Sequence, residues 1–439
     1  MQQNLLELLR CPYCGSMFEL SEVMEAQGED IIHGCLQCEC NSFPVLEGIP
    51  LLINNPAKKY VLKYLRDGEI KKAVALSINK NSRNIIRIAD FIHSKPLGTR
   101  LKKIVLDASY YFSKKQYERY SDPSTFFCDL LKPGLSGDYL KHRFSSQTFW
   151  SLYPFIPLIQ RKKRRILDVC CGSGHASFVI SRYVNPEELV CVDADFRHLY
   201  LAKKYFSEAE FINADANSQL PFKDNIFSSV IMMDSFHYID AKSSLSKELF
   251  RMLEAKGNLL LLHIHNSLLD NYAAGIPLSP MHLQNLFKDD AVRILPENTI
   301  VEDFIWHDRI DLSREYTSGD LVSSNLILIK SPYLEEFSDL WSKISPKKGS
   351  LIINPIYTTT CKNENKIVLE RNFPNEYFRK ENPISENYLI DMYELHPDDL
   401  KSAEITDNLL RKCILIHVPE KYIKSDFCYD VQRGSMCNV

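Results

Sequence analysis

The segment Ile166 to Gly174, which reads ILDVCCGSG, constrains the fold of this chain more than any other. Its apolar run ends at Asp168 and breaks at Gly172 and Gly174, which predicts a buried strand that turns sharply into a helix. Such a turn leaves backbone N–H groups and bare Cα atoms facing one spot, where a nucleotide-like ligand can bind. Because glycines also close ordinary strand-to-helix loops, the residues that follow must decide the matter.

Acidic residues follow the next two predicted strands. The apolar run Leu189 to Val192 ends at Asp193, which lies 19 positions after Gly174. An acid about 20 residues beyond a glycine turn is where the hydroxyls of a nucleoside ribose are bound. A third unit places Asp215 after another short strand. Since Cys170 stands where a dinucleotide site would have its first glycine, phosphate binding is not the expected use of the turn.

The segment from about Arg165 to Lys330 resembles the class I S-adenosylmethionine-dependent methyltransferases, and most closely the branch that acts in quinone biosynthesis. The resemblance rests on four motifs in order, which are DVCCGSG from Asp168, VCVDAD from Val190, ADANSQLPF from Ala214 and SLSKELFRMLEAKGNLLLL from Ser244. Two residues depart from the family pattern, Ser228 after Phe227 and Asn258 after Gly257, and neither position touches the cofactor in the family. The resemblance implies an α/β fold with a Rossmann-like seven-stranded sheet.

The same resemblance implies roles for individual residues. Asp193 would bind both ribose hydroxyls of S-adenosylmethionine, and Asp215 would face the adenine amino group. The loop of Gly172 and Gly174 would pass under the methionine part. The remaining residues of the expected cofactor site are Asp168, His175 and Ala216. The alternative is a doubly wound domain that binds another nucleotide or none, with Asp168 capping the turn and Asp193 in a solvated loop.

Cysteines are concentrated at the N-terminus, where five of the thirteen fall within the first forty residues. Four of them form two C-x-x-C pairs, Cys11 with Cys14 and Cys35 with Cys38. Two such pairs bring four thiolates to tetrahedral distance around one zinc ion, so we expect a structural zinc site. Cys40 is a spare that would replace Cys38 only with distorted spacing. Buried or redox-active thiols are the alternative, but a segment this small needs a metal to fold.

The residues around these cysteines, including NSFPVLEGIPLLI from Asn41, resemble the small zinc-ribbon proteins that activate methyltransferases. Those proteins work in trans on enzymes that modify tRNA or translation factors, whereas here the module is fused in cis. Fusion predicts a stabilising or docking role and does not by itself carry over a macromolecular substrate. We therefore expect residues 1–55 to form a zinc ribbon.

Three further regions are expected after the ribbon. Residues 56–155 would form a helical and lid region, 156–332 the methyltransferase domain, and 333–439 a small α+β accessory region with strands near Leu351, Ile367 and Cys413. Aromatic residues crowd the stretch before the first strand of the domain. Most of these rings are expected in a core, with Phe149, Trp150 and Tyr153 as candidates for a lid over the acceptor.

Methyl transfer requires mainly positioning and exclusion of water, because the sulfonium supplies the reactivity. A base is needed only when the acceptor must lose a proton. His237, after the fourth strand, is the candidate catalytic base, with His263 and His265 as weaker ones. Histidines held by hydrogen bonds in the core are the alternative. A metal site formed by the three histidines is not expected.

Composition sets limits on partners. With 45% hydrophobic and 25% charged residues the chain is typical of globular proteins, and its net charge of −3 gives no sign of a general nucleic-acid surface. The basic run Arg161 to Arg165 is expected to be a solvated entry to the sheet. No stretch reaches the length of a membrane span, and the N-terminal residues lack features of a signal peptide, so we expect a cytoplasmic protein.

Three functions stay open at this stage. The leading one is a methyltransferase for a small molecule, such as a planar or aromatic metabolite, with a pocket lined by residues 139–155. The second is an enzyme that modifies tRNA or protein. The third is a scaffold that binds S-adenosylmethionine without catalysis. The sequence does not predict the oligomeric state.

Overall fold

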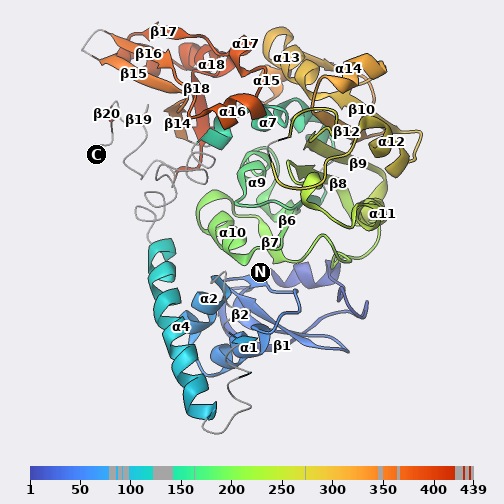
Figure 1. The fold of residues 1–439 in the computed structure, drawn as a ribbon, viewed down its shortest axis with the longest axis vertical. Coiled ribbons are helices and arrows are strands. Elements are labelled where there is room, and N and C mark those ends of the chain that lie inside the picture. Colours follow the sequence, from blue (N-terminus) through green and yellow to red (C-terminus); the bar gives the residue numbers. More distant parts are fainter. Residues whose placement is uncertain are drawn as a thin grey trace.

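A seven-stranded sheet lies in the middle of the molecule, between the N-terminal strands and the C-terminal region (Figure 1). The computed structural model describes residues 1–78, 86–87, 91, 98–121, 142–162, 164–271, 273–344, 350–362, 366–420, 429–430 and 435–436. Seven strands form the sheet in the order β10-β12-β9-β8-β5-β6-β7. In chain order they are β5 (Ile166–Val169), β6 (Leu189–Asp193), β7 (Glu210–Asn213), β8 (Phe227–Met233), β9 (Leu253–Ile264), β10 (Val292–Pro296) and β12 (Leu326–Lys330).

Strand direction identifies the ligand-binding edge of this sheet. The strands β7, β6, β5, β8 and β9 are parallel, whereas β12 runs antiparallel to both β9 and β10. All residues of β5 and β8 are buried, as expected for parallel strands covered on both faces. The chain passes from β5 to β6 on one side, while β8 lies on the other, so the strand order reverses at β5. In such sheets ligands bind outside the carboxyl ends of the strands at this reversal.

Helices pack along the sheet and connect its strands. Those between β5 and β12 are α9 (His175–Ile180), α10 (Phe196–Leu201), α11 (Lys242–Met252), α12 (Pro280–Leu286), α13 (Glu297–His307) and α14 (Ser318–Val322), with single turns at η4 (Pro186–Glu188), η5 (Ala202–Phe206) and η6 (Phe236–Tyr238). Asp195 caps α10 by accepting the backbone N–H of Arg197 at 2.9 Å. This Rossmann-like arrangement confirms the α/β fold predicted from the glycine turn and its acids.

The N-terminal residues form a module that packs on the edge of the central sheet. It contains η1 (Gln3–Leu8) and the antiparallel strands β1 (Glu19–Gln27), β2 (Asp30–Gln37), β3 (Ser42–Leu46) and β4 (Ile49–Pro50). Just after β4, the backbone N–H of Leu52 donates to the carbonyl of Asn213 in β7 at 2.8 Å. Leu9 and Phe222 form a second bridge, and both are fully buried in a core shared with β5 and β8. The module therefore covers the edge strand and shares a hydrophobic core with the central sheet.

Helices connect this module to the central sheet. They are α1 (Lys58–Arg66), α2 (Ile70–Ile78) and the long α4 (Gly98–Ser121), followed by η2 (Arg143–Ser145), α7 (Gln147–Trp150), η3 (Tyr153–Phe155) and α8 (Ile156–Gln160). Part of the predicted lid, residues 122–141, lies outside the described residues. The three lid candidates Phe149, Trp150 and Tyr153 are 1%, 3% and 6% exposed and pack with Trp341 around a cavity of about 260 Å³. They belong to the core, and this corrects their expected place over the acceptor.

The C-terminal region packs at the opposite end of the molecule from the N-terminal module (Figure 1). Its elements are β13 (Glu336–Ser338), α15 (Leu340–Lys343), β14 (Ser350–Ile353), β15 (Tyr357–Lys362), β16 (Ile367–Arg371), α16 (Glu376–Glu381), α17 (Ser385–Tyr388), β17 (Met392–Leu395), η7 (Pro397–Lys401), α18 (Ala403–Arg411), β18 (Leu415–Val418), β19 (Tyr429–Asp430) and β20 (Ser435–Met436). Its first strand, β13, pairs with β11 (Arg309–Asp311), which lies between α13 and α14. The predicted strands near Leu351, Ile367 and Cys413 correspond to β14, β16 and β18. Among the described residues, no helix is long and apolar enough to cross a membrane.

Candidate functional site

A cavity of about 1270 Å³ opens at the carboxyl ends of the parallel strands. Single ligands occupy pockets of about 300–1,000 Å³, so this cavity has room for two molecules side by side. Its wall comes from every part of the chain: Leu51 and Ile53 follow the N-terminal strands, Val61 lies in α1, and Phe378 and Glu381 lie in α16. The C-terminal region, for which the sequence offers no chemistry, therefore forms one wall of the site.

One end of the cavity carries the acids that follow β6 and β7. The Asp193 carboxylate accepts the backbone N–H of Gly172 at 2.9 Å and that of Asp195 at 2.8 Å. Asp215 accepts the N–H of Asn217 at 2.9 Å, and Ala216 lies beside it on the wall. Burial raises the pKa of Asp193, although these two amides oppose the shift. Two acids and the glycine loop thus meet at one end of the cavity.

The two glycines of the turn, Gly172 and Gly174, have different surroundings and different structural roles. Gly172 has φ +54°, and a Cβ added there would meet no atom within 4 Å, so its Cα faces open space at the cavity. Gly174 has φ +84°, and its Cβ would lie 2.8 Å from the Cβ of Ala202. Gly174 is not among the cavity-lining residues. It allows α9 to begin close to the next helix, and only Gly172 offers a bare Cα to a ligand.

Asp168 and His175 also line this end. The ring of His175 lies among aromatic rings, with its centroid 4.8 Å from Phe144 and 5.0 Å from Phe206. The carboxyl group of Asp168 is buried and accepts the hydroxyl of Ser177 at 2.6 Å. Burial, helped by the nearby charge of Asp193, raises the pKa of Asp168 to about 7. Asp168 therefore carries a proton in mildly acidic solution.

This raised pKa predicts an effect of pH on folding. Because the folded state holds the Asp168 proton more tightly than the unfolded state, its stabilising contribution is present below about pH 4 and is lost as pH rises towards 7. Asp168→Asn removes the ionisation and keeps an acceptor for Ser177. We expect this variant to gain stability over the wild type, by a few kcal/mol, between pH 5 and pH 8 in urea unfolding. A stability difference that does not change with pH would contradict the assignment.

The other end of the cavity carries polar side chains at the carboxyl ends of β8 and β9. Three residues at the ends of neighbouring strands have the left-handed backbone: Cys170 after β5 with φ 58°, Asp234 after β8 with φ 51°, and His263 in β9 with φ 50°. Such conformations are costly for side chains other than glycine and cluster at functional sites. All three residues line the cavity.

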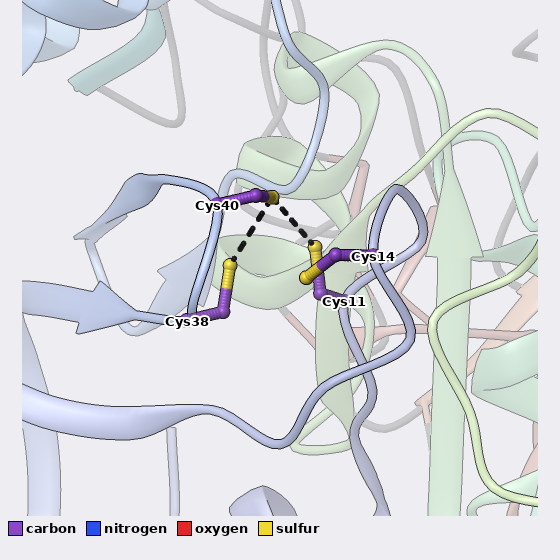
Figure 2. A group of neighbouring side chains, drawn as sticks. All are labelled: Cys11, Cys14, Cys38 and Cys40. Atoms are coloured by element: carbon purple, nitrogen blue, oxygen red, sulfur yellow. Dashed lines mark hydrogen bonds between the residues drawn. The ribbon is translucent and has the colours of Figure 1, made fainter.

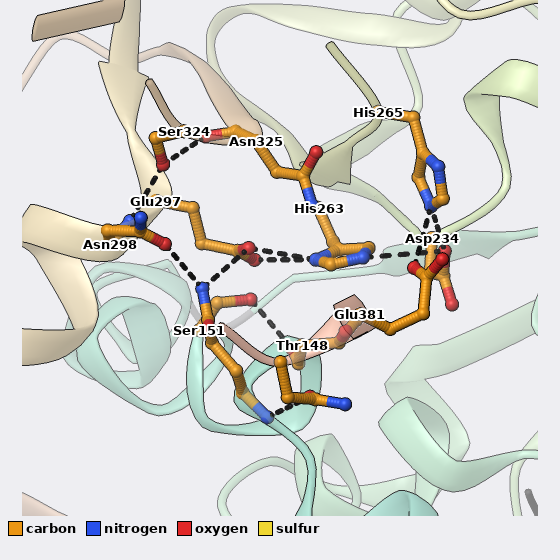
Figure 3. A network of polar contacts seen from close by, with 12 residues as sticks. Thr148, Ser151, Asp234, His263, His265, Glu297, Asn298, Ser324, Asn325 and Glu381 are labelled. Atoms are coloured by element: carbon orange, nitrogen blue, oxygen red, sulfur yellow. Dashed lines mark hydrogen bonds and ion pairs between the residues drawn. The ribbon is translucent and has the colours of Figure 1, made fainter. Parts of the chain in front are cut away.

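A polar network joins Asp234 and His263 to α7 and to α13 (Figure 3). His263 Nδ1 lies 2.8 Å from the fully buried carboxylate of Glu297, which also accepts Gln147 Nε2 at 3.3 Å. Burial alone would lower the pKa of His263, but the charges of Glu297 and Asp234 raise it to about 9. Sequence patterns do not single out Glu297, because it lies at the start of an ordinary amphipathic helix.

Asp234 is the centre of the same network. One oxygen pairs with Arg143 Nη1 at 2.8 Å, and the other lies 3.3 Å from His265 Nε2. Burial would raise the pKa of Asp234, but Arg143 and His263 hold it well below its usual range. Glu381 approaches His265 to 3.8 Å. Asp234 directly follows a buried strand, which is a usable sequence signal, whereas nothing in the sequence near Glu381 indicates a site.

His237, the expected catalytic base, is not among the cavity-lining residues, while His263 and His265 are. It lies in η6, is 3% exposed, and packs its ring against that of His265 with centroids 4.0 Å apart. Burial and the neighbouring His265 lower its pKa to about 3. Because His237 lies behind the residues that line the cavity, its position does not support the expected role as a base that contacts the acceptor.

The N-terminal cysteine cluster differs from the expected one in one ligand (Figure 2). The sulfur atoms of Cys11, Cys14, Cys38 and Cys40 all lie within 4.8 Å of one another. Cys35 is fully buried within β2, and its thiol faces the carbonyl of Leu36. Residues three apart in a strand point to opposite faces, so a C-x-x-C that begins inside a strand cannot converge. Cys40 takes the place predicted for Cys35, since the chain bends after Cys38.

The arrangement of the four sulfur atoms fits a zinc ion. Cys40 Sγ lies 3.6 Å from both Cys11 Sγ and Cys38 Sγ. Tetrahedral zinc with Zn–S bonds of about 2.3 Å separates its sulfur ligands by about 3.8 Å. Cys11 and Cys14 converge because a tight turn ending at Gly15, with φ 75°, separates them. The cluster therefore has the ligands and spacing of a structural zinc site.

The basic run before β5 is partly neutralised by acids. Arg161 pairs with Glu335 at 2.5 Å, and its guanidinium packs on the ring of Tyr333. Arg164 pairs with Glu254 at 3.3 Å. These pairs support a structural role for the run at the entry to the sheet.

Known proteins are similar to part of this chain. Residues 166–257 match a family described as a methyltransferase domain. Demethylmenaquinone methyltransferase of Thermotoga maritima is 26% identical over 152 residues, which cover 35% of this chain and 63% of that protein. The ubiquinone/menaquinone biosynthesis C-methyltransferase UbiE of Pasteurella multocida is 28% identical over 117 residues, covering 25% and 43%. The chain thus spans less than two thirds of either relative.

Among solved structures, the YcgJ protein of Bacillus subtilis shares 19% sequence identity, with a TM-score of 0.30. The match covers 42% of this chain and 98% of that one.

Proposed function

We propose that this chain is an S-adenosylmethionine-dependent methyltransferase. The observation that carries the proposal is the meeting of Asp193, Asp215 and Gly172 at one end of a cavity that has room for a second molecule. The residues that match the methyltransferase family span the strands and loops from which these side chains come. Asp193 would bind the ribose hydroxyls, Asp215 would face the adenine, and Gly172 would lie under the methionine part.

Methyl transfer at this site needs a nucleophilic atom of the acceptor in line with the methyl group. Its lone pair forms the new bond to the methyl carbon, while the carbon–sulfur pair returns to sulfur and S-adenosylhomocysteine leaves. Glu381 lines the cavity at the Asp234 end, and burial raises the pKa of its carboxyl group, so it would accept a proton that the nucleophile loses. The walls contributed by the N-terminal strands, α1 and α16 would limit the access of water to the sulfonium.

A small, planar or aromatic acceptor suits the second end of the cavity. Tyr238, Tyr377 and Phe378 supply rings for stacking, next to the polar groups of Asp234 and His265. Residues of α16 close this end, which supports a small molecule over a nucleic acid or a protein. We also propose that zinc held by the cysteine cluster maintains the N-terminal module and, through it, the wall formed by Leu51 and Ile53.

Isothermal titration of the full chain with S-adenosylmethionine tests the cofactor. We expect one molecule bound per chain, and an absence of binding would overturn the proposal. Incubation of a metabolite extract with the chain and methyl-labelled cofactor then tests the acceptor. The label should appear in a small molecule, whereas label confined to RNA or protein would contradict the proposed acceptor class while leaving the enzyme class intact.

A further inference from the structure

His237 is buried without satisfying its polar atoms. Only 3% of the residue is exposed, and neither ring nitrogen has a hydrogen-bond partner among the residues that the structure describes. Leaving a buried polar group unsatisfied costs about 1–3 kcal/mol, so such a group calls for an explanation. Its ring packs on that of His265, and one of its nitrogens lies within 4.8 Å of ligand atoms of His265 and Asp234. These atoms surround a point at the cavity wall.

We propose that Asp234, His237 and His265 bind a divalent first-row transition-metal ion at this point. Two imidazoles and one carboxylate on one side of an ion leave its remaining coordination positions open. Because Asp234 and His265 line the cavity, those positions face the space proposed for the acceptor. An oxygen atom of the acceptor would occupy one of them. This last assignment rests on the proposed function, whereas the metal site itself does not.

Hydrogen bonds already orient two of the three ligands. His265 Nδ1 lies 3.1 Å from the amide oxygen of Asn271, so it is this nitrogen that carries the proton and Nε2 that faces Asp234. Asp234 has one oxygen fixed by Arg143, which leaves the other directed towards the imidazoles. Metal-binding histidines typically donate their second nitrogen to an oxygen atom in this way. The left-handed backbone at Asp234 supplies the turn that places its carboxylate here.

The ligand atoms of Asp234, His237 and His265 need to move only slightly closer together to bind one ion. Metal–nitrogen and metal–oxygen bonds of about 2.1 Å place neighbouring ligand atoms roughly 3.0–3.4 Å apart. Asp234 and His265 already meet this separation at 3.3 Å. The remaining adjustment falls on the ring of His237, which no described hydrogen bond restrains.

Charge around the point also favours a cation. The carboxylates of Asp234, Glu297 and Glu381 lie in one network, in which Arg143 contributes one permanent positive charge. Nitrogen ligands select transition ions over Mg²⁺ and Ca²⁺, which prefer oxygen.

Metal stoichiometry distinguishes this site from the cysteine cluster. The full chain is dialysed against Zn²⁺ and the bound metal measured by mass spectrometry. We expect two ions per wild-type chain, one in the double variant His237→Gln/His265→Gln, and two in the control His282→Gln, which changes an exposed histidine of α12. Two ions retained by the double variant, or one in the wild type, would overturn the proposal.

Cobalt binding to the wild-type chain provides a test that does not depend on the folding of a variant. Thiolate ligands give Co²⁺ intense charge-transfer absorption, whereas nitrogen and oxygen ligands give only weak visible bands. We expect one equivalent with the sulfur signature and one without it. A titration that ends after the sulfur-bound equivalent would overturn the site. Because S-adenosylmethionine is absent, this outcome is independent of whether the chain binds the cofactor.

Discussion

Replacing Cys40 with serine is expected to abolish zinc binding by the N-terminal module. Cys40 is one of four sulfur atoms that lie within 4.8 Å of one another. Structural zinc sites contribute about 10–16 kcal/mol of apparent binding free energy, which small modules use to fold. Loss of one thiolate should lower zinc affinity by orders of magnitude and leave the module unfolded at ordinary zinc concentrations. Zinc content after dialysis, together with urea unfolding, measures both effects.

The matched control is Cys35→Ala, because the sequence pattern and the structure disagree about this residue. Cys35 is buried in β2 and lies outside the cluster, so its replacement should cost only about 1 kcal/mol for the lost packing and leave zinc bound. If Cys35→Ala loses zinc while Cys40→Ser keeps it, the C-x-x-C pairing is right and the cluster in the structure is not.

Replacing Asp193 with alanine is expected to weaken S-adenosylmethionine binding at least 100-fold. Hydrogen bonds to a charged group contribute about 1.5–3 kcal/mol each, and two ribose hydroxyls would lose their acceptor. The replacement also removes the carboxylate that accepts hydrogen bonds from the backbone N–H groups of Gly172 and Asp195. The loop that would contact the cofactor is then held less firmly. Isothermal titration measures the change in Kd.

Two comparisons separate binding from folding in this experiment. Glu187→Ala, an exposed change in η4 before the same strand, should leave Kd unchanged. Thermal unfolding of the Asp193 variant should remain cooperative, since the strand itself is intact. A Kd within threefold of the wild type would remove Asp193 from the cofactor site.

The sequence predicts the central sheet well because the physical signals there are local. A buried strand, a glycine turn and an acid at the next strand end fix β5, β6 and the loop between them within about thirty residues. The cavity-lining positions of Asp168, Asp193 and Asp215 agree with this reading. Gly174 is different, because the close approach of Ala202 that requires it is a tertiary contact that no local pattern reveals.

Long-range contacts explain what the sequence does not predict. Glu381 reaches His265 across 116 residues of chain, and Gln147 reaches Glu297 across 150. Such pairs have no characteristic spacing. The error at Cys35 has another cause, since C-x-x-C is a good zinc pattern only where the chain turns between the cysteines, and Cys35 lies in a continuous strand. The apolar residues near it, Ile31, Ile32 and Leu36, indicate that strand.

The wall contributed by α16 has a consequence for how this protein is made. Residues in and next to α16 form one wall of the cavity, although they are translated long after the strands that carry Asp193 and Asp215. A nascent chain that has emerged only as far as β12 would expose the cofactor half of the site to water, with no enclosed place for an acceptor. A chain truncated after β12 would remain in that condition. Transfer activity would therefore begin only after α16 has been synthesised.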